Sequence, residues 1–440
     1  MPDTKKEVSM YCCGPTVYRD AHVGNLRTFL LSDLIRRVIE IGGTKVKVIQ
    51  NITDVGHMAD DAEIEDKVIA QATLEKIAPF EIARKYEVRF HADLERLNIR
   101  KADSYPRASE CIEMMHKLIS TLIEQGFAYV GSDQSVYFNA HSFATYGAIS
   151  GNKLDSLKPG HRYQYSDDGG KKFHADWALW KNAANRTEMI WDSPWGVGFP
   201  GWHIECSAMS LNFLNSHVDI HVGGIDLRFP HHENERAQSN AITKNEAVDI
   251  WVHGEHLLFE GRKMAKSSGN VVLLQDLIDK NIDPLALRLC FMENRYRTQM
   301  DLTWDSIAAA QITIKRWRKK MAQWGANFEL EEDEEMISAL ENDLDLPRLL
   351  QRIRAIEKDE RIPDVAKRAR FNFAEQVLAL DLHRVQRKAP LTPAQQNLLS
   401  KRDQARKEQR WSDSDLLRIE LEKTGLEIRD LVDGQEWDWR

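Results

Sequence analysis

The stretch VSMYCCGPTVYRDAHVGNLRTFLLSDLIRRVIEIGGTKVKVIQ, residues 8–50, predicts how the fold begins. Residues 8–13 have the pattern of a short buried strand. Apolar side chains then recur at helical spacing from Val23 to Ile41, until two glycines end the helix. Residues 44–54 have the pattern of a second strand. A strand, a helix and a strand joined in this way form a right-handed crossover, which indicates a parallel sheet covered by helices.

Ligands of such sheets bind at the carboxyl ends of the strands. Cys13, His22 and Thr53 all lie close to a predicted strand end or to the helix start beside it. We therefore expect these three residues to belong to one site.

The alternation of strand and helix breaks in the middle of the chain. Residues 60–125 have a helical pattern, residues 128–190 are strand-like and irregular, and nearly everything beyond about residue 270 is helical. We also expect an acidic break at 331–336 and a polar linker at 391–396. The sequence thus predicts an α/β fold: a doubly wound parallel Rossmann-type sheet with an inserted α+β connective domain, followed by all-α C-terminal domains.

The composition is that of an ordinary soluble protein, with 42% hydrophobic and 29% charged residues. We find no apolar run long enough to span a membrane and no apolar leader, so we expect a cytoplasmic protein without a membrane partner. A net charge of −8 argues against a protein that coats nucleic acid indiscriminately, although a local basic face remains compatible with it. Free thiols or metal ligands, rather than a disulfide framework, are expected of the five scattered cysteines, Cys12, Cys13, Cys111, Cys206 and Cys290.

The segment HVGGIDLRFPHHENERAQ, residues 221–238, gathers histidines and carboxylates around glycines and one proline. The glycines allow the backbone to pass close to a ligand, and Pro230 fits the first turn of a helix. On that helix His231 and Glu235 stand four residues apart, a spacing that suits two ligands of one metal ion. A solvated polar first turn would account for the pair equally well.

Two loops have the residues of a phosphate site. In AHVGN, His22, Gly24 and Asn25 lie at a helix start, where backbone N–H groups favour a phosphate and both polar side chains can donate to it. In EGRKMAKSSGN, residues 260–270, Lys263 and Lys266 can stabilise a triphosphate under attack. Taken alone, this second loop would more often be a basic surface turn.

Together these segments carry a family resemblance. AHVGN and KMAKS resemble the HIGH and KMSKS signatures of class I aminoacyl-tRNA synthetases. More narrowly, the chain resembles the cysteinyl-tRNA synthetase family from about residue 9 to the terminal DGQEWDWR, through the blocks MYCCGPTVYRDAHVGNLRT, NITDV, SPWGVGFPGWHIECSAMS, DIHVGGIDLRFPHHENERAQ and KMAKSSGN. It departs from the family at Ala265, where serine is usual, and in NITDVGHM and HVGG, which indicates a divergent branch.

The resemblance implies one zinc ion, held by Cys13, Cys206, His231 and Glu235. Zinc takes a thiol as thiolate, whereas a serine hydroxyl is a much poorer ligand, so the metal would replace an editing site. Cys12 is the rival of Cys13. Neighbouring strand residues point to opposite faces, so only one of them can reach the ion, and the family pattern favours Cys13.

The same blocks imply further site residues. Asp226 would contact the substrate ammonium or the ribose, and Trp202 and Thr53 would line the amino-acid pocket. His203 and His221 lie nearby, with the better claim for His221. His232 would orient a metal ligand through a hydrogen bond, and Glu233 would be solvated. The substrate and ATP site would also include Gly14, Thr16, Gly24, Gly223 and Gly224.

The implied activity is ATP-dependent formation of cysteinyl-adenylate from L-cysteine, followed by transfer to tRNA(Cys). Mg²⁺ and the catalytic residues His22, Asn25, Lys263 and Lys266 would stabilise the phosphates during the first step. Basic segments at 314–320 and 401–411, each with a tryptophan, suit phosphate contact and base stacking, although solvated helix faces are equally compatible. The C-terminal candidates for anticodon contact are Trp437, Trp439 and Arg440.

The resemblance also implies domain boundaries, and it leaves two alternative functions open. It implies a monomer. The two catalytic halves would lie at 1–60 and 190–262, on either side of a connective insertion at 61–189. The KMSKS loop and stem-contact helices would follow at 263–330, then a helical tRNA-binding bundle at 331–390 and an anticodon-binding segment at 391–440. One rival transfers activated cysteine to a small-molecule amine, as the resembling mycothiol ligases do. The other is a non-catalytic paralogue that binds RNA or cysteine. The long helical tail favours tRNA over the small amine.

Overall fold

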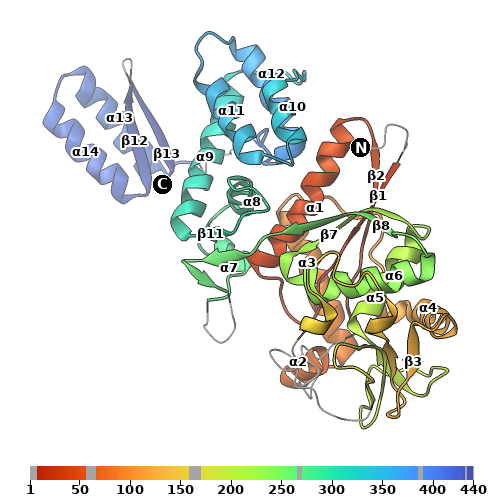
Figure 1. Cartoon of the computed structure of the whole chain (residues 1–440). Coiled ribbons are helices and arrows are strands. Elements are labelled where there is room, and N and C mark those ends of the chain that lie inside the picture. The colour runs from red at the N-terminus through yellow and green to blue at the C-terminus, as the bar shows by residue number, and fades with distance from the viewer. Residues whose placement is uncertain are drawn as a thin grey trace. The chain divides into compact units, whose positions relative to one another are not determined.

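The computed structural model describes residues 7–55, 66–157, 170–264, 270–384, 390–431 and 434–439. It divides into two compact units, Met1–Leu382 and His383–Arg440 (Figure 1). The predicted site residue Lys266 and the predicted anticodon residue Arg440 lie outside the described residues. No helix in the described ranges is both long enough and apolar enough to cross a membrane.

A four-stranded parallel sheet organises the first unit. Its strands are β1 (Glu7–Cys12), β2 (Lys45–Gln50), β7 (Val218–Gly224) and β8 (Val248–Gly254), in the order β2-β1-β7-β8. Because all four run in the same direction, their carboxyl ends lie at one edge of the sheet. The predicted parallel sheet is confirmed.

Helix α1 (Val23–Ile41) makes the crossover from β1 to β2, as the periodicity predicts. His22 caps its start, and Gly42 and Gly43 follow its end, with Gly43 at φ 81° in the left-handed region that glycine tolerates. The apolar stripe of α1 joins a core that includes Met10 and Cys12 of the central strand. This core covers one face of the sheet.

The other face carries α5 (Trp202–Phe213) and α6 (Glu233–Thr243), which pack against each other. Their core includes Tyr11 and Cys13, the alternate positions along the first strand. Alternation along a strand therefore sends Cys12 and Cys13 to opposite faces, and only Cys13 faces α5 and α6. The expectation that Cys12 is a core residue is confirmed.

A mixed α and β insertion separates the two halves of the sheet. Its helices are α2 (Lys67–Glu75), α3 (Pro79–Arg96) and α4 (Ile112–Glu124). Its strands β3 (Ala128–Val130), β4 (Val136–Phe138), β5 (Trp177–Asn182) and β6 (Gly198–Pro200) form an antiparallel sheet in sequence order. The last of these strands lies beyond residue 190, so the sheet of the insertion extends up to the start of α5.

A small sheet and a run of helices complete the first unit. The small sheet contains β9 (Leu257–Phe259), β10 (Arg262–Lys263) and β11 (Met300–Leu302). The helices are α7 (Leu274–Asp279), α8 (Pro284–Met292), α9 (Trp304–Gln323), α10 (Glu334–Glu341), α11 (Leu346–Lys358) and α12 (Asp364–Leu378). The acidic segment at 331–336 is more than a break, because Asp333 caps α10 and the acids after it lie in the first turn, where the helix dipole favours them.

The second unit corrects two expectations. The predicted linker at 391–396 is wrong: Thr392 caps α13 (Pro393–Lys407), and Gln395 completes a capping box. The all-α prediction needs an addition, because α14 (Trp411–Lys423) is followed by an antiparallel hairpin, β12 (Leu426–Leu431) and β13 (Gly434–Trp439). Leu426 and Ile428 alternate into a small core beneath the hairpin, a strand pattern too short to stand out in a helical region.

Candidate active site

Four predicted ligands meet at the carboxyl edge of the parallel sheet. One ligand atom from each of Cys13, Cys206, His231 and Glu235 lies within 4.8 Å of every other, and all four residues are buried. Cys13 directly follows β1, Cys206 lies in α5, and Glu235 lies in the first turn of α6. The Nε2 atom of His231 is 2.9 Å from Oε1 of Glu235, and Sγ of Cys13 lies 3.7 Å from the same oxygen. Residues far apart in the chain thus form one cluster.

The acid–base state of this cluster suits a cation. Burial raises the pKa of Glu235 well above its ordinary value. Burial also raises the pKa of Cys13, whose thiol donates a hydrogen bond that lowers the pKa of Cys206. A divalent ion would supply the positive charge that lets thiols and carboxylate ionise together. Two sulfurs, one imidazole nitrogen and one carboxylate oxygen are a donor set that fits zinc.

A second set of four shares two of these residues. Cys13, His221, His232 and Glu235 also place their ligand atoms within 4.8 Å of one another. Sγ of Cys13 is 3.4 Å from Nε2 of His221 and 3.3 Å from Nε2 of His232. Burial lowers the pKa values of both histidines, so their rings are neutral. The set with two thiols is the softer donor set, and the assignment of the zinc ligands to it stays a prediction.

His231 is held from behind by two predicted neighbours. Nδ1 of His203 lies 2.9 Å from Nδ1 of His231, on the opposite side of the ring from Glu235. The ring of Trp202 packs over the imidazole of His231 at a centroid distance of 4.3 Å. Such contacts fix the orientation of a ligand ring, so His203 has a positioning role that the sequence alone ranked below that of His221.

The start of α6 differs from the prediction. The regular helix begins at Glu233, three residues after Pro230, and an irregular helical turn at Arg228–His232 precedes it. Phe229, before the proline, is extended at φ −143° and ψ 132°, as expected of a residue that precedes proline. The turn nevertheless keeps His231 and Glu235 on one side.

Glu233 is not solvated, contrary to the prediction. It is fully buried, and its Oε2 accepts from the backbone N–H groups of Ile149 at 3.1 Å and Ser150 at 2.8 Å. This carboxylate therefore holds the segment of the insertion that passes over α6. Sequence reasoning failed here because a charged residue early in a helix carries no sign of the segment that covers it.

The two glycines at the end of β7 make room for protein side chains. A Cβ atom at Gly223 would lie 2.5 Å from Cε1 of His232, and one at Gly224 would lie 2.3 Å from Oδ1 of Asp226. A Cβ at Gly14 would lie only 1.6 Å from the carbonyl oxygen of Asn51. We predicted that a ligand would approach the backbone closely at 223 and 224. In the structure the imidazole of His232 lies against Gly223, and the carboxylate of Asp226 lies against Gly224.

His22 and Asn25 form a reciprocal cap at the start of α1. The backbone N–H of Asn25 donates to Nδ1 of His22 at 3.3 Å, and that of His22 donates to Oδ1 of Asn25 at 3.2 Å. Burial and the neighbouring Arg19 lower the pKa of His22, so its ring is neutral. Because Nδ1 accepts, the proton lies on Nε2, which can donate to an anion at the helix start.

The second signature lies against the first. The side chain of Met264 is the nearest neighbour of Gly24, where a Cβ would lie 2.9 Å from its Cε. The backbone N–H of Val23 donates to the carbonyl of Val272 at 3.0 Å. Lys263 is exposed at the end of β10, and its carbonyl accepts from the side chain of Asn270 at 3.0 Å. Both ends of the loop thus lie close to the start of α1.

The predicted residues Thr16 and Thr53 lie on paired backbone segments at the strand ends. The N–H of Thr53 donates to the carbonyl of Pro15, and Thr16 and Thr53 form a parallel bridge. The Thr53 hydroxyl donates to buried Glu205 at 3.3 Å and accepts from Asn51 at 3.0 Å. Asn51 also accepts from the N–H of Gly14 at 2.8 Å.

Three aromatic residues near the cluster escaped the sequence analysis. The ring of Tyr11 lies 5.0 Å from that of His221, and the ring of Trp251 stacks on His221 at 4.5 Å. His253 places Nε2 2.9 Å from Nδ1 of His232. Tyr11 could have been found, because it stands two positions before Cys13 and so on the same face of the strand.

Some of the predicted RNA-contact residues are buried and others are exposed. Trp317 is fully buried and donates from Nε1 to Glu357 at 3.0 Å, so the prediction that it stacks on bases is wrong. Arg402 is likewise buried and bonds Asp430 at 2.8 Å. Trp411 is 58% exposed, whereas Trp437 packs against the small core of the second unit.

Comparisons with protein families agree with this architecture. Residues 1–312 match the family described as "tRNA synthetases class I (C) catalytic domain". Residues 388–437 match the "Cysteinyl-tRNA ligase anticodon binding domain". Two separate domains of one kind of enzyme thus follow each other in the chain.

Curated relatives align over nearly the whole chain. A cysteine–tRNA ligase of Thermus thermophilus is 39% identical, with 99% of this chain and 96% of the relative covered. The cysteine–tRNA ligase of Deinococcus radiodurans is 37% identical, with 99% and 93% covered.

Solved structures show the fold. The methionyl-tRNA synthetase of Mycobacterium tuberculosis in complex with methionyl-adenylate has a TM-score of 0.57 at 14% identity and covers 85% of this chain and 90% of its own. The leucyl-tRNA synthetase of Agrobacterium radiobacter in a ternary complex has a TM-score of 0.63 at 9% identity, with 86% and 84% covered.

Proposed function

The chain belongs to the cysteine–tRNA ligase family of class I aminoacyl-tRNA synthetases, and from this premise we propose that it activates L-cysteine with ATP and charges tRNA(Cys). The observation that carries the proposal is the buried cluster of Cys13, Cys206, His231 and Glu235 at the same sheet edge as the start of α1. A thiol-selective site and a phosphate site then share one edge of the sheet, as cysteine activation requires.

We propose that Cys13, Cys206, His231 and Glu235 hold one zinc ion. Zinc bound there would offer a soft Lewis-acid position that accepts a thiolate much better than a hydroxyl. Shape alone separates such similar side chains by only about 1–3 kcal/mol. His203 and Trp202 keep the imidazole of His231 in its orientation, and His221 faces the same space with a neutral ring.

In the first step the cysteine carboxylate attacks the α-phosphorus of ATP. One P–O bond forms, the bond to the β-phosphate oxygen breaks, and pyrophosphate leaves with the electron pair. Nε2 of His22, the N–H groups at the start of α1 and the ammonium groups of Lys263 and Lys266 stabilise the phosphate charge, together with Mg²⁺ that accompanies ATP. Asp226 lies near enough to His22 to influence its pKa, and it would take the substrate ammonium or the ribose.

In the second step a ribose hydroxyl of the terminal tRNA nucleotide attacks the activated carbonyl. A new ester bond forms, the anhydride bond between the cysteinyl carbonyl carbon and the phosphate oxygen breaks, AMP leaves with the electron pair, and the hydroxyl proton is released. Class I membership favours the 2′-hydroxyl. No covalent intermediate with the enzyme is needed. The residues of the site contribute by holding the two reactants in contact.

For the acceptor, tRNA is favoured over a small amine because residues 388–437 match an anticodon-binding domain. A small-molecule ligase has no use for such a domain. We propose a cytoplasmic monomer, since one chain carries both the activating site and the anticodon domain, and ATP and tRNA meet in the cytoplasm.

Two assays test the proposal. The protein should catalyse ATP–pyrophosphate exchange that depends on cysteine and is not supported by serine, and it should charge tRNA(Cys). Absence of exchange would point to a non-catalytic paralogue. Exchange without charging of tRNA, together with ligation of cysteine to an amine, would point to the small-molecule ligase.

A further inference from the structure

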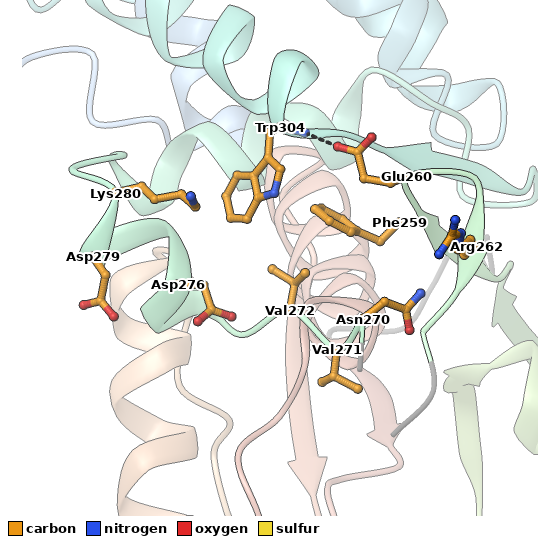
Figure 2. Close-up of a pocket in the computed structure, with 10 residues that line it drawn as sticks. All are labelled: Phe259, Glu260, Arg262, Asn270, Val271, Val272, Asp276, Asp279, Lys280 and Trp304. Carbon is orange, nitrogen blue, oxygen red and sulfur yellow. Dashed lines mark hydrogen bonds between the residues drawn. The ribbon is translucent and has the colours of Figure 1, made fainter. Parts of the chain in front are cut away.

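A cavity lies against the signature loop at residues 260–270, which contributes Glu260, Arg262 and Asn270 to its lining. Its volume is about 570 Å³, within the range of small-molecule sites. Figure 2 shows its lining, which comes from β9 and the turn after it, β10, the segment 270–272, α7 with the residue after it, and the first residue of α9. None of its lining residues belongs to the metal cluster or to the cap at the start of α1. The lining residues are Phe259, Glu260, Arg262, Asn270, Val271, Val272, Asp276, Asp279, Lys280 and Trp304.

The wall of the cavity offers an aromatic platform. The indole of Trp304 meets the ring of Phe259 edge-on at a centroid distance of 5.5 Å. The ammonium of Lys280 lies 4.7 Å from the centre of the Trp304 ring. Lys280 is exposed, and an exposed cation–π contact is weaker than the stacking of a nucleobase on an aromatic ring. A planar base can therefore displace the ammonium from the ring.

Charges of both signs are separated around this platform. Figure 2 shows Asp276, Asp279 and Lys280 on one side of the cavity and Arg262 on the other. Oδ2 of Asp276 accepts from the N–H of Leu273, and Oδ1 of Asp279 accepts from Gln275. Each carboxylate keeps a second oxygen that can accept from an exocyclic amine. Arg262 is exposed and its guanidinium can pair with a phosphate.

We propose that this cavity binds a nucleotide whose base carries an exocyclic amine, which adenine, cytosine and guanine do and uracil does not. The base stacks on Trp304 and donates to Asp276 or Asp279, while Arg262 and the displaced Lys280 pair with the phosphate. Uracil lacks the amine and would bring carbonyl oxygens to the carboxylates. Two sources share this chemistry, a free nucleotide and a nucleotide of the RNA substrate.

The free nucleotide is tested on full-length protein whose active site is saturated with a hydrolysis-resistant sulfamoyl analogue of cysteinyl-adenylate. Calorimetric titration with AMP, CMP and UMP should show one further site for AMP and CMP and about tenfold weaker binding of UMP. Asp279→Asn, Lys280→Ala and Trp304→Ala should each weaken that site about tenfold. Ile312→Ala, an exposed change on the same helix α9, should leave it unchanged.

The RNA source is tested with the same variants. If the occupant is part of the RNA, Lys280→Ala and Asp279→Asn raise KM for tRNA in charging several-fold and leave the rate of cysteine-dependent exchange unchanged. Because Lys280 and Asp279 are exposed, these variants keep the fold even if Trp304→Ala does not.

The outcomes separate cleanly. A further nucleotide site that the variants weaken supports the free source, and a selective rise in KM for tRNA supports the RNA source. Absence of both effects, or equal binding of UMP, overturns the proposal. The inference rests on the proposed function only for the blocking compound and the charging assay. Exchange activity of the unmodified protein is therefore measured first, and its absence would refute the function rather than the cavity.

Discussion

At the scale of single residues, the face of the sheet toward which a cysteine points determines whether its thiol can bind a metal. Cys12 and Cys13 are adjacent, but the first joins the core under α1 and the second meets Cys206. Burial raises the pKa of Cys12 to about 12. Cys206 differs, because the hydrogen bond from Cys13 lowers its pKa. Of these buried cysteines, Cys12 stays a protonated, unreactive thiol, whereas Cys206 can ionise and bind a metal.

Exchange of sulfur for oxygen in Cys206 should remove the metal. We expect Cys206→Ser to lower bound zinc from about one equivalent to well below half and to abolish cysteine-dependent exchange, because a hydroxyl is a poor zinc ligand. Metal analysis and exchange assays measure the two effects. Cys290→Ser is the matched control, since this buried thiol lies outside the cluster. Full activity of Cys206→Ser without metal would contradict the ligand assignment.

A second prediction at this scale concerns the contribution of Glu233 to the free energy of unfolding. Glu233→Ala should lower the free energy of unfolding by about 1–3 kcal/mol, because two backbone N–H groups lose their acceptor. Glu233→Gln should cost less, since its amide oxygen can still accept from both. Denaturant unfolding and limited proteolysis near residue 149 are the measurements. Equal stability of the alanine variant and the parent would show that the contact is replaced by water.

At the scale of elements, α1 connects the phosphate site to the helical region. Its Asp33 accepts from Arg37 and from Arg288 of α8, each at 2.7 Å, and the side chains of Asp33 and Arg288 are fully buried. Arg288 also donates to the carbonyl of Leu378 at 2.6 Å, at the end of α12. Arg37 of α1 donates from Nη1 to the carbonyl of Gln376 at 3.1 Å, so arginines from two other helices bind carbonyls at the end of α12. The cluster fixes α12 to α1, the helix whose start His22 caps.

This buried ion pair predicts a pH-dependent effect. Burial opposes ionisation of Asp33, but Arg288 and Arg37 outweigh it and lower the pKa of the carboxyl below its ordinary value of about 3.9. The ionised carboxylate stabilises the fold fully above the pKa of the unfolded chain, and this contribution is lost as the pH falls through the folded pKa. Asp33→Asn should therefore cost about 3–5 kcal/mol near pH 7, and this difference from the parent should shrink only below about pH 4.

Unfolding curves between neutral and acidic pH measure this difference. Asp249→Asn serves as the control, because its carboxylate is 48% exposed and should matter little. A difference between Asp33→Asn and the parent that is the same at every pH would mean that the charge of Asp33 does not stabilise the fold.

At the scale of the whole molecule, the two compact units separate the proposed reaction site from the matched anticodon-binding domain. Every residue assigned to the metal cluster and the phosphate site lies within Met1–Leu382. The matched anticodon-binding domain begins at residue 388, in the second unit.

Removal of the second unit should separate activation from charging. A chain that ends at Leu382 should keep cysteine-dependent exchange within about twofold of the full chain. Its kcat/KM for tRNA charging should fall by more than about tenfold, because contacts at the anticodon are lost. Exchange and charging assays on both chains measure this. Loss of exchange in a folded truncated chain would show that the second unit is needed for activation itself.

The sequence by itself determined the elements and the chemistry of the signatures. Period-3.6 apolar spacing predicted α1, glycines predicted its end, and strand alternation separated Cys12 from Cys13, because these patterns depend on residues close in the chain. The resemblance supplied the four ligand positions. A local pattern of capping residues at 391–396 was present too, although we interpreted it as a linker.

Only the tertiary structure decided what surrounds each residue. In the folded chain the insertion covers Glu233, and the His232 ring lies against Gly223. Trp317 is buried in the helical core, and Trp304 lines a cavity beside the signature loop. Each outcome depends on segments that are far apart in the chain and meet only on folding. Burial and the identity of contacting groups are set by long-range packing, and no local period or spacing encodes them.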